Sequence, residues 1–204
     1  MSKASGTGSS DAAVGIELLA SEPEPVTVLA DSAYGSGELR GELAAGAHLD
    51  LVKPAPLRPA VPGGFTVDDF TVEHTTRTAT CPAGATRDIT PAGNAIFTTA
   101  CRSCALRARC TTSVSGKTLH LRPHDALQRA ARVSARSPDW QNEYRQHRPM
   151  VERSIAWLTR QNRRVRYRGV ANNDLWLHHR VAAVNLRRLI TLGLDRTATN
   201  WAIA

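Results

Sequence analysis

The chain has 204 residues, of which 42% are hydrophobic and 22% charged, a composition typical of a folded soluble protein rather than a disordered segment. It has no apolar run of about 18 residues and no signal-peptide pattern, so we expect a cytoplasmic protein without a membrane partner. The 26 Lys+Arg residues against 18 Asp+Glu give a net charge of +8, which favours nucleic acid as the partner. Residues 120–190 hold 15 of the basic residues and only 5 acidic ones.

The first quarter of the chain alternates between helical and strand-like patterns. Residues 1–12 are small and polar and predict a flexible lead-in, and a short helix is expected directly after them. The segment 25–31 predicts a buried strand, 36–46 a helix that ends at Gly46, and 48–54 a second strand stopped by Pro54. This order predicts an α/β arrangement over residues 13–54.

The pattern changes after Pro54. Residues 55–122 contain short Thr-rich runs, Pro and Gly turns and all four cysteines, and predict a β-rich insertion without helices. Residues 123–192 predict helices over 125–137, over 140–148, from Pro149 to Arg160 and over 174–192, and 193–204 a tail. The core candidates here are Leu175, Val181, Val184, Leu186, Leu189, Ile190 and the three tryptophans Trp140, Trp157 and Trp176.

Asp31 follows the first predicted strand and precedes a Gly/Ser turn. A carboxylate at the carboxyl end of a strand is where α/β proteins place their ligands. The same position also suits an aspartate that accepts a backbone N–H in an Asx turn or caps the next helix. Both interpretations are open from the sequence alone.

Glu152 lies three residues after Pro149, and Pro is favoured in the first turn of a helix. An acidic residue there can simply stabilise the helix N-terminus. Tyr144, Arg148 and Glu152 are spaced at i, i+4 and i+8, however, and would share one face if the helix ran unbroken through Pro149. A carboxylate beside an arginine suggests a metal ligand next to a phosphate contact.

Several segments together resemble the DDE-type transposases of bacterial insertion sequences, in the branch with a cysteine-bearing insertion between its second and third acidic residues. They are ADSAYGSGE, CPAG, CRSCALRARC, YRQHRPMVERSIAWL and RYRGVANNDLWLHHRVAAVNLRRL. The resemblance implies an RNase H-like fold, with Asp31 as the second Asp and Glu152 as the Glu of the catalytic triad. It also implies two Mg²⁺ (or Mn²⁺) ions at these carboxylates and DNA contacts by Tyr144 and Arg148.

The chain departs from that family pattern at two places. Related transposases have a Lys about two turns after the Glu, whereas here Thr159 and Arg160 stand there. The first Asp of the triad belongs to an earlier strand, and only about twenty residues precede the Asp31 strand, so we expect a chain incomplete at its N-terminus. The resemblance then implies weak or absent activity alone, and association with itself or with a full-length transposase.

The cysteines Cys81, Cys101, Cys104 and Cys110 are separated by 19, 2 and 5 residues. One C-x2-C pair with two further cysteines is compatible with a structural Zn²⁺ site. Buried free cysteines or a redox-active pair are equally open interpretations. His120 or His124 could replace one ligand.

An arginine-rich segment precedes the last predicted helix. It contains Arg160, Arg163, Arg164, Arg166 and Arg168 with Tyr167 among them, which suits a phosphate-binding track with one stacking contact. The alternative is a solvated basic face.

We therefore predict a DNA transposase of the DDE type, associated with the nucleoid. A non-enzymatic DNA-binding remnant or regulator of transposition is the first alternative. A zinc-ribbon nucleic-acid-binding protein unrelated to transposases is the second.

Overall fold

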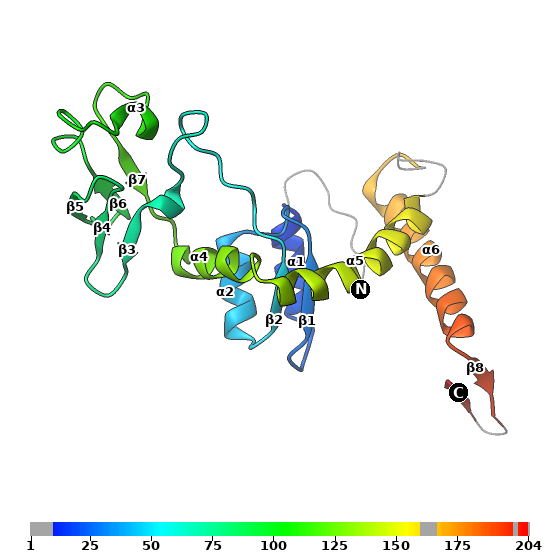
Figure 1. Cartoon of the computed structure of the whole chain (residues 1–204). Coiled ribbons are helices and arrows are strands. Elements are labelled where there is room, and N and C mark those ends of the chain that lie inside the picture. Colours follow the sequence, from blue (N-terminus) through cyan, green and yellow to red (C-terminus); the bar gives the residue numbers. More distant parts are fainter. Residues whose placement is uncertain (1–9, 160–166, 198–199, 204) are drawn as a thin grey trace. The chain divides into compact units, whose positions relative to one another are not determined.

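The computed structural model describes residues 10–159, 167–197 and 200–203. Figure 1 labels its helices and strands. The chain divides into two compact units. The central unit comprises Glu24–Ser137, and the terminal unit comprises Met1–Pro23 together with Pro138–Ala204.

The central unit begins with a β-α-β segment. β1 (Thr27–Ala30) and β2 (Leu49–Val52) pair in parallel, with Thr27 opposite Leu49 and Ala30 opposite Val52. The connecting helix α2 (Gly37–Ala45) begins where Ser36 Oγ accepts the Leu39 N–H at 3.1 Å. These three elements confirm the sequence prediction to within two residues. Four residues of α2 and β2 form the buried side of this segment: Leu39, Leu43, Leu51 and Val52.

A buried ion pair joins α2 to β2. The Arg40 side chain is only 1% exposed and pairs with the carboxylate of Asp50. Its Nη2 also donates to the carbonyl oxygen of Val52 at 3.0 Å. A buried charge is tolerated only when it is paired and hydrogen-bonded, so these contacts explain how an arginine can lie inside the α/β layer.

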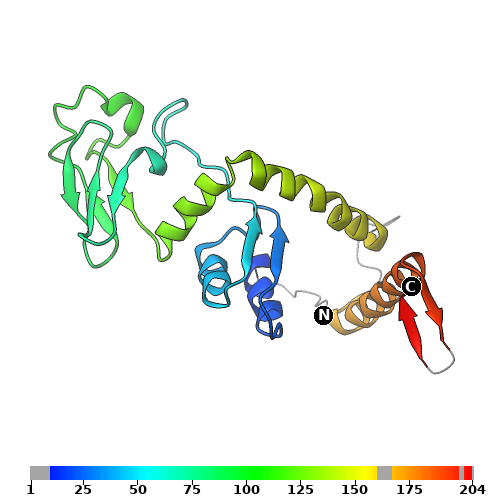
Figure 2. The same cartoon turned by 60° about the horizontal axis from the view of Figure 1, so that its bottom comes forward.

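Residues 55–122 form the β-rich part of the same unit. β3 (Thr71–Glu73), β4 (Thr78–Thr80) and β5 (Thr86–Asp88) make a three-stranded antiparallel sheet, and β6 (Asn94–Ile96) pairs antiparallel with β7 (Thr118–His120). An isolated bridge between Ile89 and Ala95 connects the two sheets. Figure 2 shows the strands of the three-stranded sheet side by side.

Two short helical elements occur in this part of the chain, where we predicted no helix. η1 (Val67–Asp69) is a 3-10 turn and α3 (Arg107–Cys110) a single helical turn. Such short elements have no recognisable apolar period, because one turn is shorter than the window that shows it.

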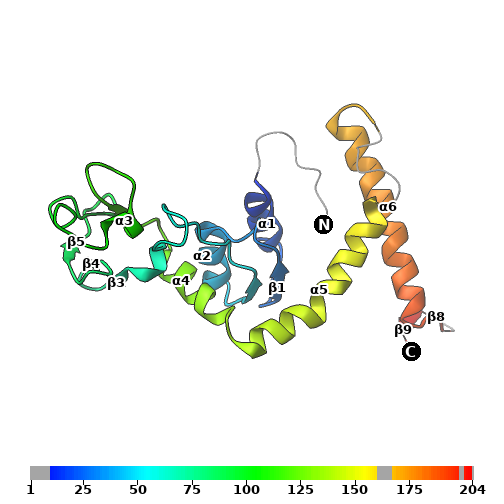
Figure 3. The same cartoon turned by 45° about the horizontal axis from the view of Figure 1, so that its top comes forward.

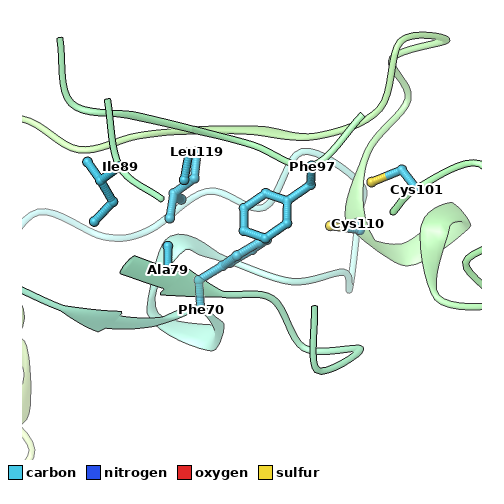
Figure 4. Close-up of a cluster of buried hydrophobic side chains, with 8 residues drawn as sticks. Phe70, Ala79, Ile89, Phe97, Cys101, Cys110 and Leu119 are labelled. Atoms are coloured by element: carbon cyan, nitrogen blue, oxygen red, sulfur yellow. The ribbon is translucent and has the colours of Figure 1, made fainter. Parts of the chain in front are cut away.

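The β-rich part has its own hydrophobic core. The ring centroids of Phe70 and Phe97 lie 5.7 Å apart. Cys101 and Cys110 lie beside Phe97 (Figure 4). The complete buried cluster is Phe70, Ala79, Ile89, Ala95, Phe97, Cys101, Cys110 and Leu119. Half of the predicted zinc ligands are therefore also core residues.

Helix α4 (Asp125–Ser134) links the two parts of the central unit. Arg132 binds both carboxylate oxygens of Asp68 at 2.7 and 2.8 Å, and Arg129 donates to the Val67 and Phe70 carbonyls. From the same helix, Gln128 Nε2 donates to the Gly35 carbonyl at 2.9 Å. The β-α-β segment and the β-rich part are thus held against a common helix.

The terminal unit contains α1 (Asp11–Leu19), α5 (Pro138–Thr159), α6 (Val170–Thr191) and the antiparallel strands β8 (Leu194–Arg196) and β9 (Trp201–Ile203). Arg180 of α6 donates to the Trp157 carbonyl at 2.9 Å, and Arg188 approaches the Met150 sulfur at 3.7 Å. These contacts join the C-terminal half of α5 to the middle and the C-terminal half of α6, and Figure 3 shows the two helices crossing each other. No helix in the described part of the chain is long and apolar enough to cross a membrane.

Two predictions for the terminal unit were wrong. Pro149 does not begin a helix but lies inside α5, which is unbroken from Pro138 to Thr159. Several predicted core residues of α6 are exposed, among them Leu175 at 60% and Ile190 at 61%, and Trp157 is 38% exposed. An apolar stripe marks one face of a helix, but it does not show that another element covers that face. Strands β8 and β9 were not foreseen in the predicted tail.

Candidate functional site

Asp31 lies directly after β1, at the carboxyl end of the parallel strand pair. The Lys53 N–H donates to the Ala30 carbonyl at 2.9 Å, so the ladder continues to the residue just before Asp31. Asp31 Oδ1 accepts the Ala33 N–H at 2.9 Å. Asp31 thus forms an Asx turn, one of the two interpretations that the sequence allowed. The turn lies at the sheet edge where α/β folds place their ligand sites.

The turn that follows Asp31 is held on two sides. A Cβ at Gly35 would lie 3.0 Å from the Lys53 carbonyl oxygen and 3.3 Å from that of Ser32, so the backbone approach is tight and favours glycine. The Gly35 carbonyl accepts the bond from Gln128 of α4. Asp31 therefore begins a turn whose position is set by β2 and α4.

Glu152 belongs to a column of side chains along one face of α5. Trp140 and Tyr144 stack with ring centroids 5.0 Å apart, and the Arg148 guanidinium lies 5.9 Å from the Tyr144 ring. Arg148 also forms an ion pair with Glu152, whose side chain is 54% exposed. The unbroken helix produces this column, because residues four apart face the same side. The structure thus brings Tyr144, Arg148 and Glu152 together.

The two nominated carboxylates belong to different units, Asp31 to the central unit and Glu152 to the terminal unit. Among the described residues, no group of three or more His, Cys, Asp or Glu side chains is arranged to hold a metal ion. A shared magnesium site at Asp31 and Glu152 therefore stays a prediction.

The arginine-rich segment connects α5 to α6. Arg160, Arg163, Arg164 and Arg166 lie outside the described residues, whereas Arg168 is described and exposed.

Asn173 holds the described end of that segment, a role that we did not predict. It is 7% exposed, and its Nδ2 donates to the carbonyl oxygens of Tyr167 and Gly169, both at 2.6 Å. Its Oδ1 accepts the Tyr167 N–H at 2.9 Å. Arg168 lies between these two contacts. The available signal was an asparagine in the first turns of a helix that follows a glycine, since Asn side chains often bind nearby backbone.

The four cysteines line one cavity of about 270 Å³ in the β-rich part. All four are free thiols, with Cys101 and Cys110 buried and Cys81 and Cys104 partly exposed. Burial raises the pKa of the Cys110 thiol, the Lys117 ammonium opposes this shift, and the three other cysteines add to it. Neither His120 nor His124 lines this cavity. His120 Nδ1 instead lies 2.7 Å from Asn94 Oδ1, and the His124 ring packs against Gly41.

Comparison with known families identifies the chain. A family model described as a transposase DDE domain matches residues 80–190, which is more than half of the sequence. The chain belongs to the DDE transposase family. The match includes all four cysteines, Tyr144, Arg148 and Glu152, whereas Asp31 precedes it. No curated protein and no solved structure matches the chain.

Family membership confirms the general prediction of a transposase and fits the mixed α/β architecture. DDE transposase domains in general act on DNA and use divalent metal ions.

Proposed function

We propose that the chain is a DNA transposase component that takes part in phosphodiester cleavage and strand transfer, with Asp31 and Glu152 as two of the three catalytic carboxylates on an RNase H-like fold. The observation that carries this proposal is the family match over residues 80–190, which includes the column of Tyr144, Arg148 and Glu152 on α5. The position of Asp31 at the carboxyl end of β1 supports its assignment.

The donor set fits magnesium or manganese. Both nominated ligands offer carboxylate oxygens, which hard divalent cations prefer. Two such ions, when bound, activate the attacking oxygen and stabilise the leaving oxygen. Because we assign only two of the three carboxylates, we expect weak or absent cleavage by residues 1–204 alone.

The side chains around Glu152 have distinct roles in this proposal. Arg148 holds the Glu152 carboxylate through the ion pair and presents a guanidinium that can contact a DNA phosphate. Tyr144 supports Arg148 from the preceding turn and stacks on Trp140. The arginines 160, 163, 164, 166 and 168 then extend the phosphate contacts beyond α5.

Iron-directed cleavage of the polypeptide tests the assignment without requiring transposition. Fe²⁺ replaces Mg²⁺ in the chain bound to DNA, ascorbate and peroxide are added, and mass spectrometry locates the backbone cuts. We expect cuts near both Asp31 and Glu152, and we expect excess Mg²⁺ to suppress them. In Asp31→Asn and in Glu152→Gln both sets of cuts should disappear, whereas Glu143→Gln on the same helix should retain them.

Cuts near only one carboxylate, or cuts that survive both substitutions, would overturn the shared site. A strand-cleavage assay on labelled plasmid with Mg²⁺ or Mn²⁺ accompanies the mapping. Any cleavage that the chain shows should be lost in Asp31→Asn and Glu152→Gln and kept in Glu143→Gln.

A second candidate function is that of a non-catalytic DNA-binding regulator, which associates with itself or with an active transposase. The observation that favours it is that the family match includes Glu152 but begins after Asp31. This candidate predicts salt-sensitive DNA binding with no iron-directed cuts at either carboxylate.

A further inference from the structure

We propose that Cys81, Cys101, Cys104 and Cys110 bind one structural Zn²⁺ ion, which ties together the loops around the cavity in the β-rich part of the central unit. The site is independent of the carboxylates and of the proposed cleavage reaction. Its function is to fix a part of the chain whose strands are only three residues long.

Three separate segments bring the cysteines to the cavity. Cys81 begins the tight turn between β4 and β5, where its carbonyl accepts the Gly84 N–H at 2.8 Å. Cys101 and Cys104 belong to the loop between β6 and α3, and Cys110 ends α3. All four line the same cavity and all lie within one compact unit. A single ion there would cross-link segments that are far apart in the sequence.

The chemistry of the cavity favours a thiophilic ion. Its other lining residues are mainly apolar, and no Asp, Glu or His is among the described residues that line it. A set of four thiolates selects zinc in a tetrahedral site, whereas magnesium and calcium require oxygen ligands. The Lys117 N–H already donates to Cys101 Sγ at 3.5 Å, a contact of the kind that orients metal ligands.

The charges next to the cysteines also suit a thiolate site. Four thiolates around Zn²⁺ carry a net charge of −2, which is costly to bury without compensation. Lys117 and Arg107 both line the cavity and supply two positive charges. The Lys117 ammonium lies 5.9 Å from the centre of the Phe70 ring, so the cation is held close to the core.

Binding must draw the cysteines closer together, because no three of the described metal-binding side chains are already arranged around a common point. Cys101 and Cys110 are buried and set the inner side of the site, whereas Cys81 and Cys104 are partly exposed. We therefore place the adjustment in the segments around Cys81 and Cys104. Metal sites commonly form together with the local fold in this way.

Cobalt substitution and metal analysis test the proposal on the full chain, purified under reducing conditions. We expect about one Zn²⁺ per chain, and a Co²⁺ form with the intense visible bands and sulfur-to-metal charge transfer of a tetrahedral thiolate site. Cys81→Ser and Cys104→Ser should weaken Zn²⁺ binding by at least about tenfold. Ser103→Ala is the matched control, because Ser103 lines the same cavity next to Cys104.

Cys81 and Cys104 are chosen because they are partly exposed, so their substitution leaves the buried cluster in place. Three results would overturn the proposal. They are a chain that binds no Zn²⁺, four thiols that react fully with a disulfide reagent in the presence of Zn²⁺, or a mass showing a disulfide in freshly purified protein. The last result would support the redox interpretation instead.

Discussion

At the scale of single residues, the buried Arg40 is the clearest case of a charge that stabilises the fold only through its partners. Asp50 and the Val52 carbonyl satisfy it on the β2 side. Its Nε has no hydrogen-bond partner among the described residues. The α2–β2 contact therefore depends strongly on Asp50.

Substituting Asp50 should destabilise the central unit. Asp50→Asn leaves the Arg40 charge buried and uncompensated, and we expect a loss of about 3 kcal/mol in the free energy of unfolding. Glu42→Gln, at an exposed position of α2, should change it by less than about 0.5 kcal/mol. Urea titration followed by circular dichroism measures both. Equal effects of the two substitutions would contradict the role given to the ion pair.

Asp69 gives a prediction for acid stability. Its carboxylate accepts the Thr66 N–H at 2.7 Å and the Thr66 hydroxyl at 2.8 Å, and these bonds lower its pKa below the ordinary 3.8. A lowered folded-state pKa stabilises the fold above the unfolded-state pKa, and this contribution disappears as the pH falls through the folded-state value. Asp69→Asn should therefore reduce stability at neutral pH and flatten its decline below pH 3.8.

The control for this experiment is Asp88→Asn, at the exposed end of β5. Thermal unfolding at a series of pH values compares the variants with the parent chain. A pH profile of Asp69→Asn that runs parallel to the parent profile would show that the Thr66 bonds do not couple to protonation.

At the scale of elements, α5 contains an internal proline without ending there. Pro149 has no N–H, so the Arg145 carbonyl receives no bond from it. The helix nevertheless continues from Pro138 to Thr159. This continuity is what places Tyr144, Arg148 and Glu152 on one face.

Pro149→Ala should therefore stabilise α5, by up to about 3 kcal/mol, since alanine restores the absent hydrogen bond and removes the steric conflict with the preceding turn. Gln146→Ala, at an exposed position of α5, should have an effect below about 0.5 kcal/mol. The helical signal at 222 nm during thermal unfolding measures the difference. A lower melting temperature for Pro149→Ala would show that the helix needs the proline for its packing.

The start of α6 depends on Asn173, which links the backbone of Tyr167 and Gly169 on either side of Arg168. Asn173→Ala should loosen this connection and weaken DNA binding by about threefold to tenfold. Removing a buried hydrogen-bonding group costs about 1–3 kcal/mol, and we expect part of this cost to appear as less precise positioning of Arg168 on DNA. The exposed neighbour provides the control variant Asn172→Ala. Fluorescence anisotropy with a labelled duplex distinguishes them. Equal binding by both variants would separate Asn173 from DNA recognition.

At the scale of the whole molecule, the uneven charge distribution predicts how DNA binding responds to salt. The logarithm of the binding constant falls linearly with the logarithm of the salt concentration, and each phosphate contact that is lost should make this slope less steep by about 0.9. Arg163→Gln combined with Arg164→Gln should thus reduce the slope by about 2. Arg102→Gln with Arg122→Gln removes the same charge from exposed positions of the central unit and should leave the slope nearly unchanged. A larger effect of this control pair would move the DNA-binding surface to the central unit.

Local sequence patterns predicted the elements whose apolar runs and end residues are typical of their secondary structure. The apolar run before Asp31, the Ser36 cap and the Gly46 terminus together define β1 and α2. The sequence could not show the burial of Arg40, because its partner Asp50 is ten residues away and belongs to another element. The Asn173 contacts and the strands β8 and β9 are local, but an asparagine near a helix start and strands of only three residues are weak signals in a sequence.

For the candidate site, the sequence placed Asp31 at a strand end, and it offered the Tyr144–Arg148–Glu152 face only if the helix ran through Pro149. The continuity of α5 decided between two interpretations that the local pattern left open. The grouping of the four cysteines around one cavity depends on contacts among loops, which their spacing alone does not specify.

The parallel pairing of β1 with β2 has a consequence for assembly. In the described part of the chain this sheet has two strands, so each strand has one side without a strand neighbour. Parallel sheets are normally buried and wider than this. Unpaired strand edges present rows of N–H and C=O groups that readily accept a strand from another polypeptide. We therefore expect the protein to self-associate increasingly as its concentration rises. A peptide that pairs with one of these edges as a third strand should block that edge and reduce the association.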